Sequence, residues 1–255
     1  MNASATLIFL HDYNSAASRF NRNPPNGQSL VHHLHASPAL QHLKIIIPNG
    51  LPCKHTAVQR NVWYNLNVPF PARVDPKRAH DEIEYGSTER NEDDIKVSMD
   101  YVESLIREEM ATGTPAKRVV LMGYSQGATV AALFLLTRKL GAELGAVISF
   151  AGFAPTPMAS VPRIQKENGL EGRWSKETSL FLLHGSKDAF IPVEIYYAWR
   201  ARLEGLMRRG QGIARVEGIV IEGVDHWPIE GIWPETRRIL EMVVPASSKM
   251  VDSKL

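Results

Sequence analysis

Cysteine, long apolar runs and net charge are all scarce in this chain, and each scarcity excludes a class of protein. Cys53 is the one cysteine, so no disulfide can form within the chain. Its loop-like surroundings favour an incidental thiol over a nucleophile. No stretch reaches the roughly 18 consecutive apolar residues of a membrane-spanning helix. No basic region with an apolar core and cleavage site begins the sequence, so we expect a protein that is not secreted.

Charge of one sign does not accumulate either, because the formal net charge is only +2 at pH 7. Short basic pairs such as Lys117-Arg118 are scattered, and solvated helix faces explain them better than a binding patch. We therefore expect no nucleic-acid partner. The length of 255 residues and the hydrophobic fraction of 44% suit one globular domain. We place this domain at residues 1–245 and a flexible tail at 246–255.

One stretch organises the rest of the chain. An apolar run at 119–122 breaks at Gly123-Tyr124-Ser125-Gln126-Gly127, and an apolar, helix-forming run follows. This pattern is typical of a strand, a tight turn and a helix. In a Gly-x-Ser-x-Gly turn, the serine sits on strained backbone at the top of a sheet, where a substrate can reach it. The pattern therefore predicts a nucleophilic serine at position 125.

Strand-like and helix-like segments alternate along the chain. Strands are expected at 5–10, 43–47, 118–123, 145–152, 179–185 and 215–222. Helices are expected at 29–35, after Asn91, after the serine turn, at 193–209 and at 235–244. This alternation predicts a mainly parallel sheet with helices on both faces, which binds ligands beyond the carboxyl ends of its strands.

Two of the expected helices carry further features, the one after Asn91 and the one at 29–35. Asn91 is predicted as an N-cap because three acidic residues follow it, where negative charge suits the helix dipole.

His32, His33 and His35 resemble a metal site only at first sight, because only His32 and His35 share a helix face. No cysteine or carboxylate is near them in the sequence, so we expect a solvated helix surface and no metal.

Two long connections lack a clear period. Residues 48–90 are punctuated by prolines, and we expect them to form a partly ordered flap. Its Trp63 and Tyr64 could line a ligand site or pack as a satellite core beneath the flap. Residues 153–174 are predicted to form a lid-like connection over the same end of the sheet.

The chain also offers partners for the predicted nucleophile. A serine hydroxyl needs a base that removes its proton, and a histidine serves if a carboxylate fixes its tautomer. Ser125, Asp188 and His226 follow three predicted strands in the order that α/β-hydrolases use. Asp225 precedes His226 directly and is better suited to a turn, and His184 to supporting the acid loop. We therefore predict a Ser125-Asp188-His226 triad.

The oxyanion of the tetrahedral intermediate needs preorganised donors. The α/β-hydrolase fold supplies one from the backbone N–H after the nucleophile, here Gln126, at a helix N-terminus. The second comes from the loop after the first strand, where we select the backbone N–H of Tyr13.

Together these motifs resemble the acyl-protein thioesterase and phospholipase/carboxylesterase family of α/β-hydrolases. The serine turn is similar to that family's Gly-Phe-Ser-Gln-Gly, and Leu10-His11 to its Leu-His-Gly-Leu-Gly-Asp loop. Residues 63–65 are similar to its Trp-Phe-Asp segment, and 184–192 to its His-Gly-x-x-Asp-x-x-Val-Pro loop. The resemblance covers about residues 5–244. It implies an α/β-hydrolase fold and hydrolysis of carboxylic esters or thioesters, without a metal or an organic cofactor.

The departures from the family concern substrate choice. Asp12, Tyr13 and Asn14 replace glycine, leucine and glycine in the first loop, and Asp12 brings polarity beside the oxyanion site. Trp227 is bulkier than the usual serine or glutamate. The residues expected to contact the substrate are Asp12, Trp63, Tyr64, Phe153 and Trp227.

The last three residues, Ser253-Lys254-Leu255, match the address that the peroxisomal import receptor recognises, so we expect a peroxisomal protein. The expected substrate is then an acyl-CoA, a carrier-bound acyl or polyketide group, or an ester of a specialised metabolite. The same triad could transfer the acyl group or close a lactone if water is excluded. A non-catalytic, ligand-binding protein with this fold is the alternative from another class. Apolar residues on the 48–90 segment could also serve a homodimer interface.

Overall fold

The computed structural model describes residues 5–21, 29–52, 61–65, 89–153, 160–170, 178–208 and 215–246. Cys53, most of the predicted flap at 48–90, and the tail residues Ser253, Lys254 and Leu255 lie outside these ranges. The domain boundary that we place at residue 245 stays a prediction.

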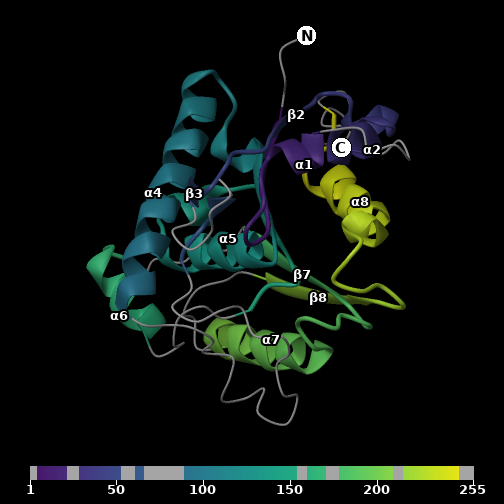
Figure 1. The fold of residues 1–255 in the computed structure, drawn as a ribbon. Coiled ribbons are helices and arrows are strands. Elements are labelled where there is room, and N and C mark those ends of the chain that lie inside the picture. Colours follow the sequence, from purple (N-terminus) through teal and green to yellow (C-terminus); the bar gives the residue numbers. More distant parts are fainter. Residues whose placement is uncertain are drawn as a thin grey trace.

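A sheet of six parallel strands forms the centre of the molecule, in the order β2-β1-β5-β6-β7-β8 (Figure 1). The strands are β1 (Ala5–Leu10), β2 (Leu43–Ile46), β5 (Val119–Tyr124), β6 (Ala146–Phe150), β7 (Ser179–Gly185) and β8 (Arg215–Ile221). Two short strands, β3 (Leu51–Pro52) and β4 (Asn61–Val62), form a separate antiparallel pair. The predicted mainly parallel sheet is confirmed.

Helices cover both faces of this sheet, as predicted (Figure 1). One face packs against α4 (Glu89–Ala111), α5 (Gln126–Thr137), α6 (Ser160–Glu167) and α7 (Val193–Arg208). The other packs against α1 (Ser18–Asn21), α2 (Leu30–His35) and α8 (Trp233–Val243). The short 3-10 helices are η1 (Pro38–Leu40), η3 (Ala116–Arg118), η4 (Leu140–Glu143) and η5 (Ile229–Ile232).

The central strands are mostly apolar because both of their faces are buried. In β1, Leu7 and Phe9 pack into the core beneath α2 and α8, whereas Ile8 and Leu10 pack into the core beneath α4 and α5. All six residues of β1 and all six of β5 are buried. Successive side chains of a strand point to opposite faces, so a strand between two helix layers is mainly apolar. The polar Thr6 of β1 is paired, because its hydroxyl donates to Glu109 Oε2 at 2.8 Å.

The start of α4 differs from the prediction. The helix begins at Glu89, so Asn91 lies within its first turn and is not the N-cap. Several residues of a polar stretch can each resemble an N-cap, so the sequence rarely identifies the first residue of a helix. The predicted apolar stripe is present, because Ile95, Met99, Val102 and Ile106 are all buried.

Of the lid predicted at 153–174, the part formed by residues 160–170 is wrong. Within this stretch, α6 packs on the end of α5, where Gln165 Nε2 donates to Leu136 O at 3.0 Å and Asn168 Nδ2 donates to Thr137 O at 2.7 Å. These carbonyls lie about 17 Å along α5 from Ser125, at 1.5 Å per residue. Residues 160–170 therefore do not cover the serine.

The loop after β1 is held by His11, whose ring is completely buried. His11 Nδ1 lies 2.7 Å from Asp12 O, and His11 Nε2 lies 3.1 Å from the backbone nitrogen of Gly50. A carbonyl can only accept and an N–H can only donate, so the proton is on Nδ1 and the ring is neutral. Burial lowers the pKa of His11 from 6.5 to about 4.

The same loop touches the start of α5. A Cβ at Gly127 would lie 2.3 Å from Leu10 O and 2.6 Å from His11 O. Real Cβ atoms do not approach backbone oxygens so closely, so only glycine allows this packing. The carboxyl end of β1 is thereby set directly against the turn that carries Ser125.

We expect Gly127→Ala to destabilise the protein by about 3 kcal/mol, because a backbone carbonyl must move to admit the methyl group. Gly169→Ala is the matched control: Gly169 has a φ of +67°, but its Cβ would meet nothing within 4 Å. The control should cost only about 1 kcal/mol, from backbone strain. Urea denaturation measures both, and equal losses would contradict the role of the close approach.

His11 should also make stability depend on pH. Above pH 6.5 the ring is neutral in both the folded and unfolded states, so burial of His11 does not lower the free energy of unfolding. As the pH falls from 6.5 towards 4, the unfolded chain binds a proton that the folded chain does not, and about 3 kcal/mol is lost. Denaturation between pH 4 and 7 should show a shallower pH dependence for His11→Gln. An unchanged pH dependence in His11→Gln would contradict this role of the buried ring.

Candidate active site

Ser125 lies between β5 and α5 with an unusual backbone conformation. Its φ is 53° and its ψ is −114°, a combination that costs strain in a residue other than glycine. The backbone N–H of Ser125 donates to Phe150 O at 2.9 Å, which ties the turn to β6. A Cβ at Gly123 would lie 2.2 Å from Gly127 O, so the turn also needs glycine at that position. The predicted sharp turn at the end of a strand is therefore present.

Asp188 and His226 meet at the ends of two neighbouring strands, β7 and β8. His226 Nδ1 lies 2.7 Å from Asp188 Oδ2, and both side chains are buried. The other carboxylate oxygen, Oδ1, accepts from the backbone N–H groups of Phe190 at 2.9 Å and Ile191 at 2.7 Å. The carboxylate is thus fixed on both sides, and it holds the imidazole with its proton on Nδ1 and with Nε2 able to accept.

The two rejected candidates occupy supporting positions. Asp225 Oδ1 accepts from the backbone N–H groups of Ala189 at 3.0 Å and His226 at 2.6 Å, so it binds the turn rather than the imidazole. His184 Nε2 donates to Ile191 O at 2.7 Å and lies 3.6 Å from Asp188 Oδ2. Burial lowers the pKa of His184, although the Asp188 carboxylate opposes this.

Gln126 supplies a contact that the sequence did not indicate. Its side-chain Oε1 accepts from Trp63 N at 2.8 Å, and its Nε2 donates to Tyr64 O at 2.7 Å. The side-chain amide therefore ties residues 61–65 to the start of α5. Its backbone N–H is among the first four of the helix, which have no partner within it. No local pattern signals a side chain that binds a distant backbone segment.

Trp63 and Tyr64 are completely buried and belong to the main core. Trp63 Nε1 donates to His11 O at 2.8 Å, and Trp63 O accepts from Ser98 Oγ. Burial raises the pKa of Tyr64. Both residues support the first loop and the serine turn here, and substrate contact by either stays a prediction.

The other predicted contact residues lie in the loops around the serine. Phe153 is buried, and its backbone is bound at both polar groups by Thr129 Oγ1, at 2.8 Å and 3.2 Å. Tyr13 is half-buried and packs against the core. Asp12 is buried, and burial raises the pKa of its carboxyl, although the facing Arg19 partly offsets this. The assignment of Tyr13 as an oxyanion donor stays a prediction.

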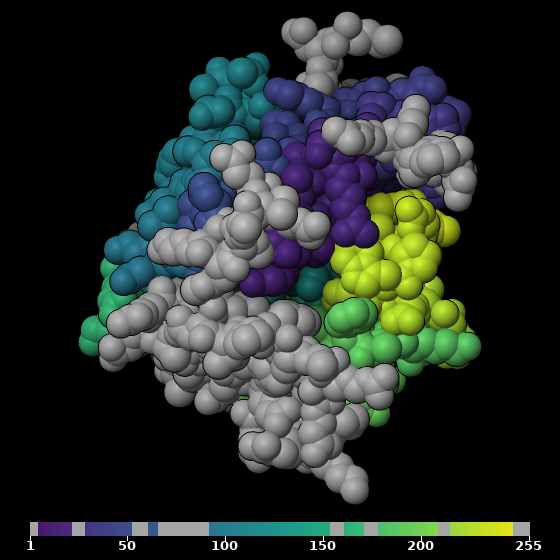
Figure 2. Space-filling view, in the orientation of Figure 1, coloured from purple at the N-terminus to yellow at the C-terminus, as the bar shows by residue number. Residues whose placement is uncertain are grey.

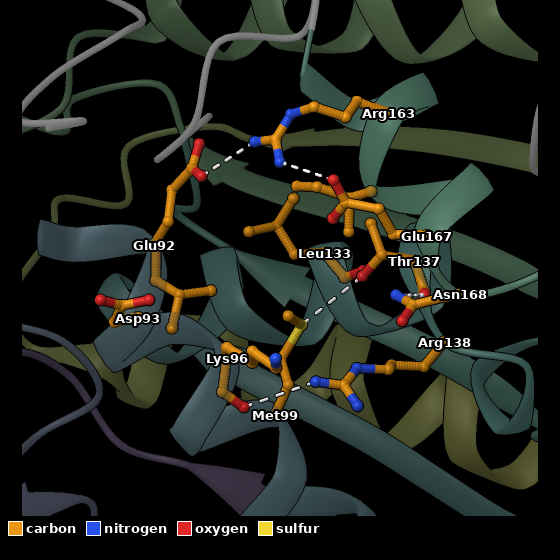
Figure 3. Close-up of a pocket in the computed structure, with 12 residues that line it drawn as sticks. Glu92, Asp93, Lys96, Met99, Leu133, Thr137, Arg138, Arg163, Glu167 and Asn168 are labelled. Carbon is orange, nitrogen blue, oxygen red and sulfur yellow. Dashed lines mark hydrogen bonds and ion pairs between the residues drawn. The ribbon is translucent and has the colours of Figure 1, made fainter. Parts of the chain in front are cut away.

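A cavity of about 310 Å³ lies between α4, α5 and α6 (Figure 3). Arg163 spans its mouth and pairs with Glu92 and Glu167, each at 2.9 Å. Met99 and Leu133 contribute apolar side chains to its wall. None of the predicted site residues lines it, so the cavity is separate from Ser125 and its neighbours.

The described residues offer no metal site and no membrane-spanning helix. No group of three or more histidine, cysteine, aspartate or glutamate residues there could hold a metal ion. Among the three histidines of α2, His35 Nε2 lies 2.9 Å from Leu43 O, to which it donates. No helix among the described residues is long and apolar enough to cross a bilayer.

Comparison with known proteins places these features in a family. The phospholipase/carboxylesterase family model matches residues 1–226. Acyl-protein thioesterase 1 of Yarrowia lipolytica is 28% identical over 189 residues, which cover 74% of this chain and 71% of that protein. Acyl-protein thioesterase 1 homolog 2 of Dictyostelium discoideum is 26% identical over 247 residues, which cover 95% and 94% respectively.

Solved structures agree on the fold. Arabidopsis thaliana SOBER1 superposes with a TM-score of 0.66 at 16% identity, covering 94% of this chain and 99% of that one. Zea mays acyl-protein thioesterase 2 also superposes with a TM-score of 0.66, at 15% identity, covering 96% and 95%. The chain belongs to the phospholipase/carboxylesterase family of serine hydrolases with the α/β-hydrolase fold.

Proposed function

We propose that this protein hydrolyses a carboxylic ester or an acyl thioester through Ser125, His226 and Asp188. The observation that carries the proposal is the 2.7 Å contact between His226 Nδ1 and Asp188 Oδ2, at the sheet end where the strained Ser125 also lies. Family membership supports ester or thioester hydrolysis. The names of the two thioesterase relatives favour the inclusion of thioesters.

Each step follows from the protonation states at the site. His226 Nε2 removes the proton from Ser125 Oγ as the oxygen attacks the carbonyl carbon, and Asp188 stabilises the imidazolium. The backbone N–H groups of Gln126 and Tyr13 bind the oxyanion. The intermediate collapses to an acyl-serine, and His226 gives its proton to the departing alcohol or thiol. Water then attacks the acyl-serine as His226 Nε2 takes its proton. The bond to Ser125 Oγ breaks, Oγ receives that proton from His226, and the acid is released.

Loss of the nucleophile or of the acid should remove activity by different routes. We expect Ser125→Ala to lower kcat at least about ten-thousand-fold and to abolish labelling by a fluorophosphonate probe. Asp188→Asn should lower kcat about a thousand- to ten-thousand-fold, because an amide no longer fixes the Nδ1 tautomer. Hydrolysis of p-nitrophenyl esters and of acyl-CoAs of varied chain length provides the measurement.

Asp225→Asn is the matched control, since an amide oxygen can still accept both hydrogen bonds that Asp225 Oδ1 receives. Its kcat should stay within about tenfold of the wild type. Equal losses at Asp188 and Asp225 would contradict the assignment. No labelling of the wild type would favour the non-catalytic, ligand-binding alternative. Products in which an added alcohol has taken the acyl group would favour acyl transfer.

The cellular site and the natural substrate are part of the proposal. We propose that Ser253-Lys254-Leu255 directs the protein to the peroxisome, which makes an acyl-CoA or an ester of a specialised metabolite a suitable substrate. A homodimer stays a prediction, and size-exclusion chromatography with light scattering would test it.

Deletion of residues 253–255 should leave a fluorescently tagged protein in the cytosol, because the import receptor reads this tripeptide. Microscopy with a peroxisomal marker is the measurement, with the tag placed at the N-terminus. A deletion variant that still overlaps the marker would contradict the import proposal.

A further inference from the structure

Arg19 is a cation with unused hydrogen-bond donors beside the candidate active site. Its guanidinium carbon lies 3.9 Å from the centroid of the Trp227 ring, and Trp227 directly follows His226. In the described part of the chain its one ion pair is with Asp12, at 3.9 Å between Nη1 and Oδ2. That distance is too long for a hydrogen bond. The planar fork of donors therefore remains available to a ligand.

The surroundings of Arg19 restrain its position. The segments that carry Arg19 and Trp227, near the two ends of the chain, lie side by side on one face of the molecule (Figure 2). The Trp227 ring meets Tyr124 and His226 at interplanar angles of 78° and 71°, with centroids 5.0 Å and 5.7 Å apart. The indole is fixed from its sides, and a face remains for the guanidinium.

The two members of the Arg19–Asp12 ion pair differ in burial. Its side chain is only 5% exposed, whereas that of Arg19 is 53% exposed. The negative end of the pair is thus buried, and the positive end faces solvent. Asp12 lies two residues beyond Leu10, which pairs with Gly123 in the parallel register of β1 and β5. Gly123 comes two residues before Ser125, and Arg19 stacks on Trp227, which directly follows His226. The Arg19–Asp12 pair therefore lies beside the candidate active site.

A pocket of about 460 Å³ lies beside Arg19 and Trp227. Its wall includes Arg19, Phe20, Leu30, Trp227, Glu230 and Trp233. This volume is in the range of small-molecule sites, and most of these side chains are apolar. Trp227 belongs both to the pocket and to the ring cluster around His226. A substrate whose carbonyl reaches Ser125 can therefore place a second group against Arg19.

We propose that Arg19, held between Asp12 and Trp227, selects esters or thioesters that carry a carboxylate or phosphate group near the reacting carbonyl. This inference rests on the proposed hydrolase function. A guanidinium binds either anion through two parallel N–H donors, which a neutral substrate cannot use. The anion can belong to the acyl group or to the leaving group, and the two positions call for different substrates.

The test compares matched neutral and anionic substrates. For the acyl side, p-nitrophenyl butyrate is compared with the p-nitrophenyl half-ester of glutarate. For the leaving group, the butyryl thioester of N-acetylcysteamine is compared with butyryl-CoA. Arg19→Gln should lower kcat/KM on the order of tenfold or more for an anionic substrate, and less than about threefold for its neutral counterpart. Arg19→Lys should restore part of the loss, since it keeps the charge without the fork.

Arg163→Gln is the matched control. Its side chain is 52% exposed, against 53% for Arg19, and it lies at the separate cavity of Figure 3. The Arg163→Gln change removes the same net charge, so it reports any general electrostatic effect. Its kcat/KM should stay within about twofold of the wild type for both neutral and anionic substrates. A selective loss in either series supports the proposal and assigns the anion to the acyl or leaving group.

Equal effects of Arg19→Gln on neutral and anionic substrates in both series would overturn the inference about Arg19. The proposed hydrolase function would be unaffected. Absence of wild-type turnover of every ester and thioester would instead contradict the proposed hydrolase function, and this inference with it.

Discussion

The contact between the end of β1 and the start of α5 is the constraint on which the candidate site depends. Gly127 packs against the carbonyl oxygens of Leu10 and His11, and no side chain would fit between them. This packing sets the first loop, with Asp12 and Tyr13, beside Ser125. The neutral ring of His11 and the indole N–H of Trp63 then fix the same loop from its other sides. Loss of the close approach would separate the nucleophile from the loop proposed to bind the oxyanion.

Hydrogen bonds hold the acid and the base of the candidate triad in place. Both oxygens of Asp188 are engaged, one by His226 and the other by two backbone N–H groups. His184 and Asp225 bind the backbone of the loops that carry the acid and the base. Buried polar groups are costly unless paired, so these bonds favour one arrangement of Asp188 and His226. A reaction that proceeds through a defined geometry benefits from this rigidity.

Much of the fold could be predicted from the sequence, because the strand and helix patterns and the serine motif are local signals. Alternating strands and helices implied the parallel sheet, and Gly-x-Ser-x-Gly implied the sharp turn at Ser125. Asp188 and His226 could be chosen because parallel strands bring their carboxyl ends to one edge, and the structure joins these two side chains. The α/β-hydrolase fold and the family are confirmed.

Features that depend on distant contacts could not be read from the sequence. The side chain of Gln126 binds backbone of residues 63 and 64, and the neutral state of His11 depends on Gly50. The stacking of Arg19 on Trp227 joins the first and last parts of the chain. The start of α4 and the packing of α6 were missed for a related reason. Polar, proline-containing stretches carry weak local preferences, which tertiary packing overrides.

The order of strands in the sheet has a consequence for the synthesis of the protein. β8 is the last strand to emerge from the ribosome and lies at the edge of the sheet, where it pairs with β7. Pairing among β2, β1, β5, β6 and β7 does not involve it. A nascent chain can therefore carry Ser125 and Asp188 while the proposed base, His226, is still missing. In the proposed mechanism, Ser125 gains its proton acceptor only when β8 joins the sheet, so an incomplete chain would expose no activated serine to the acyl esters around it.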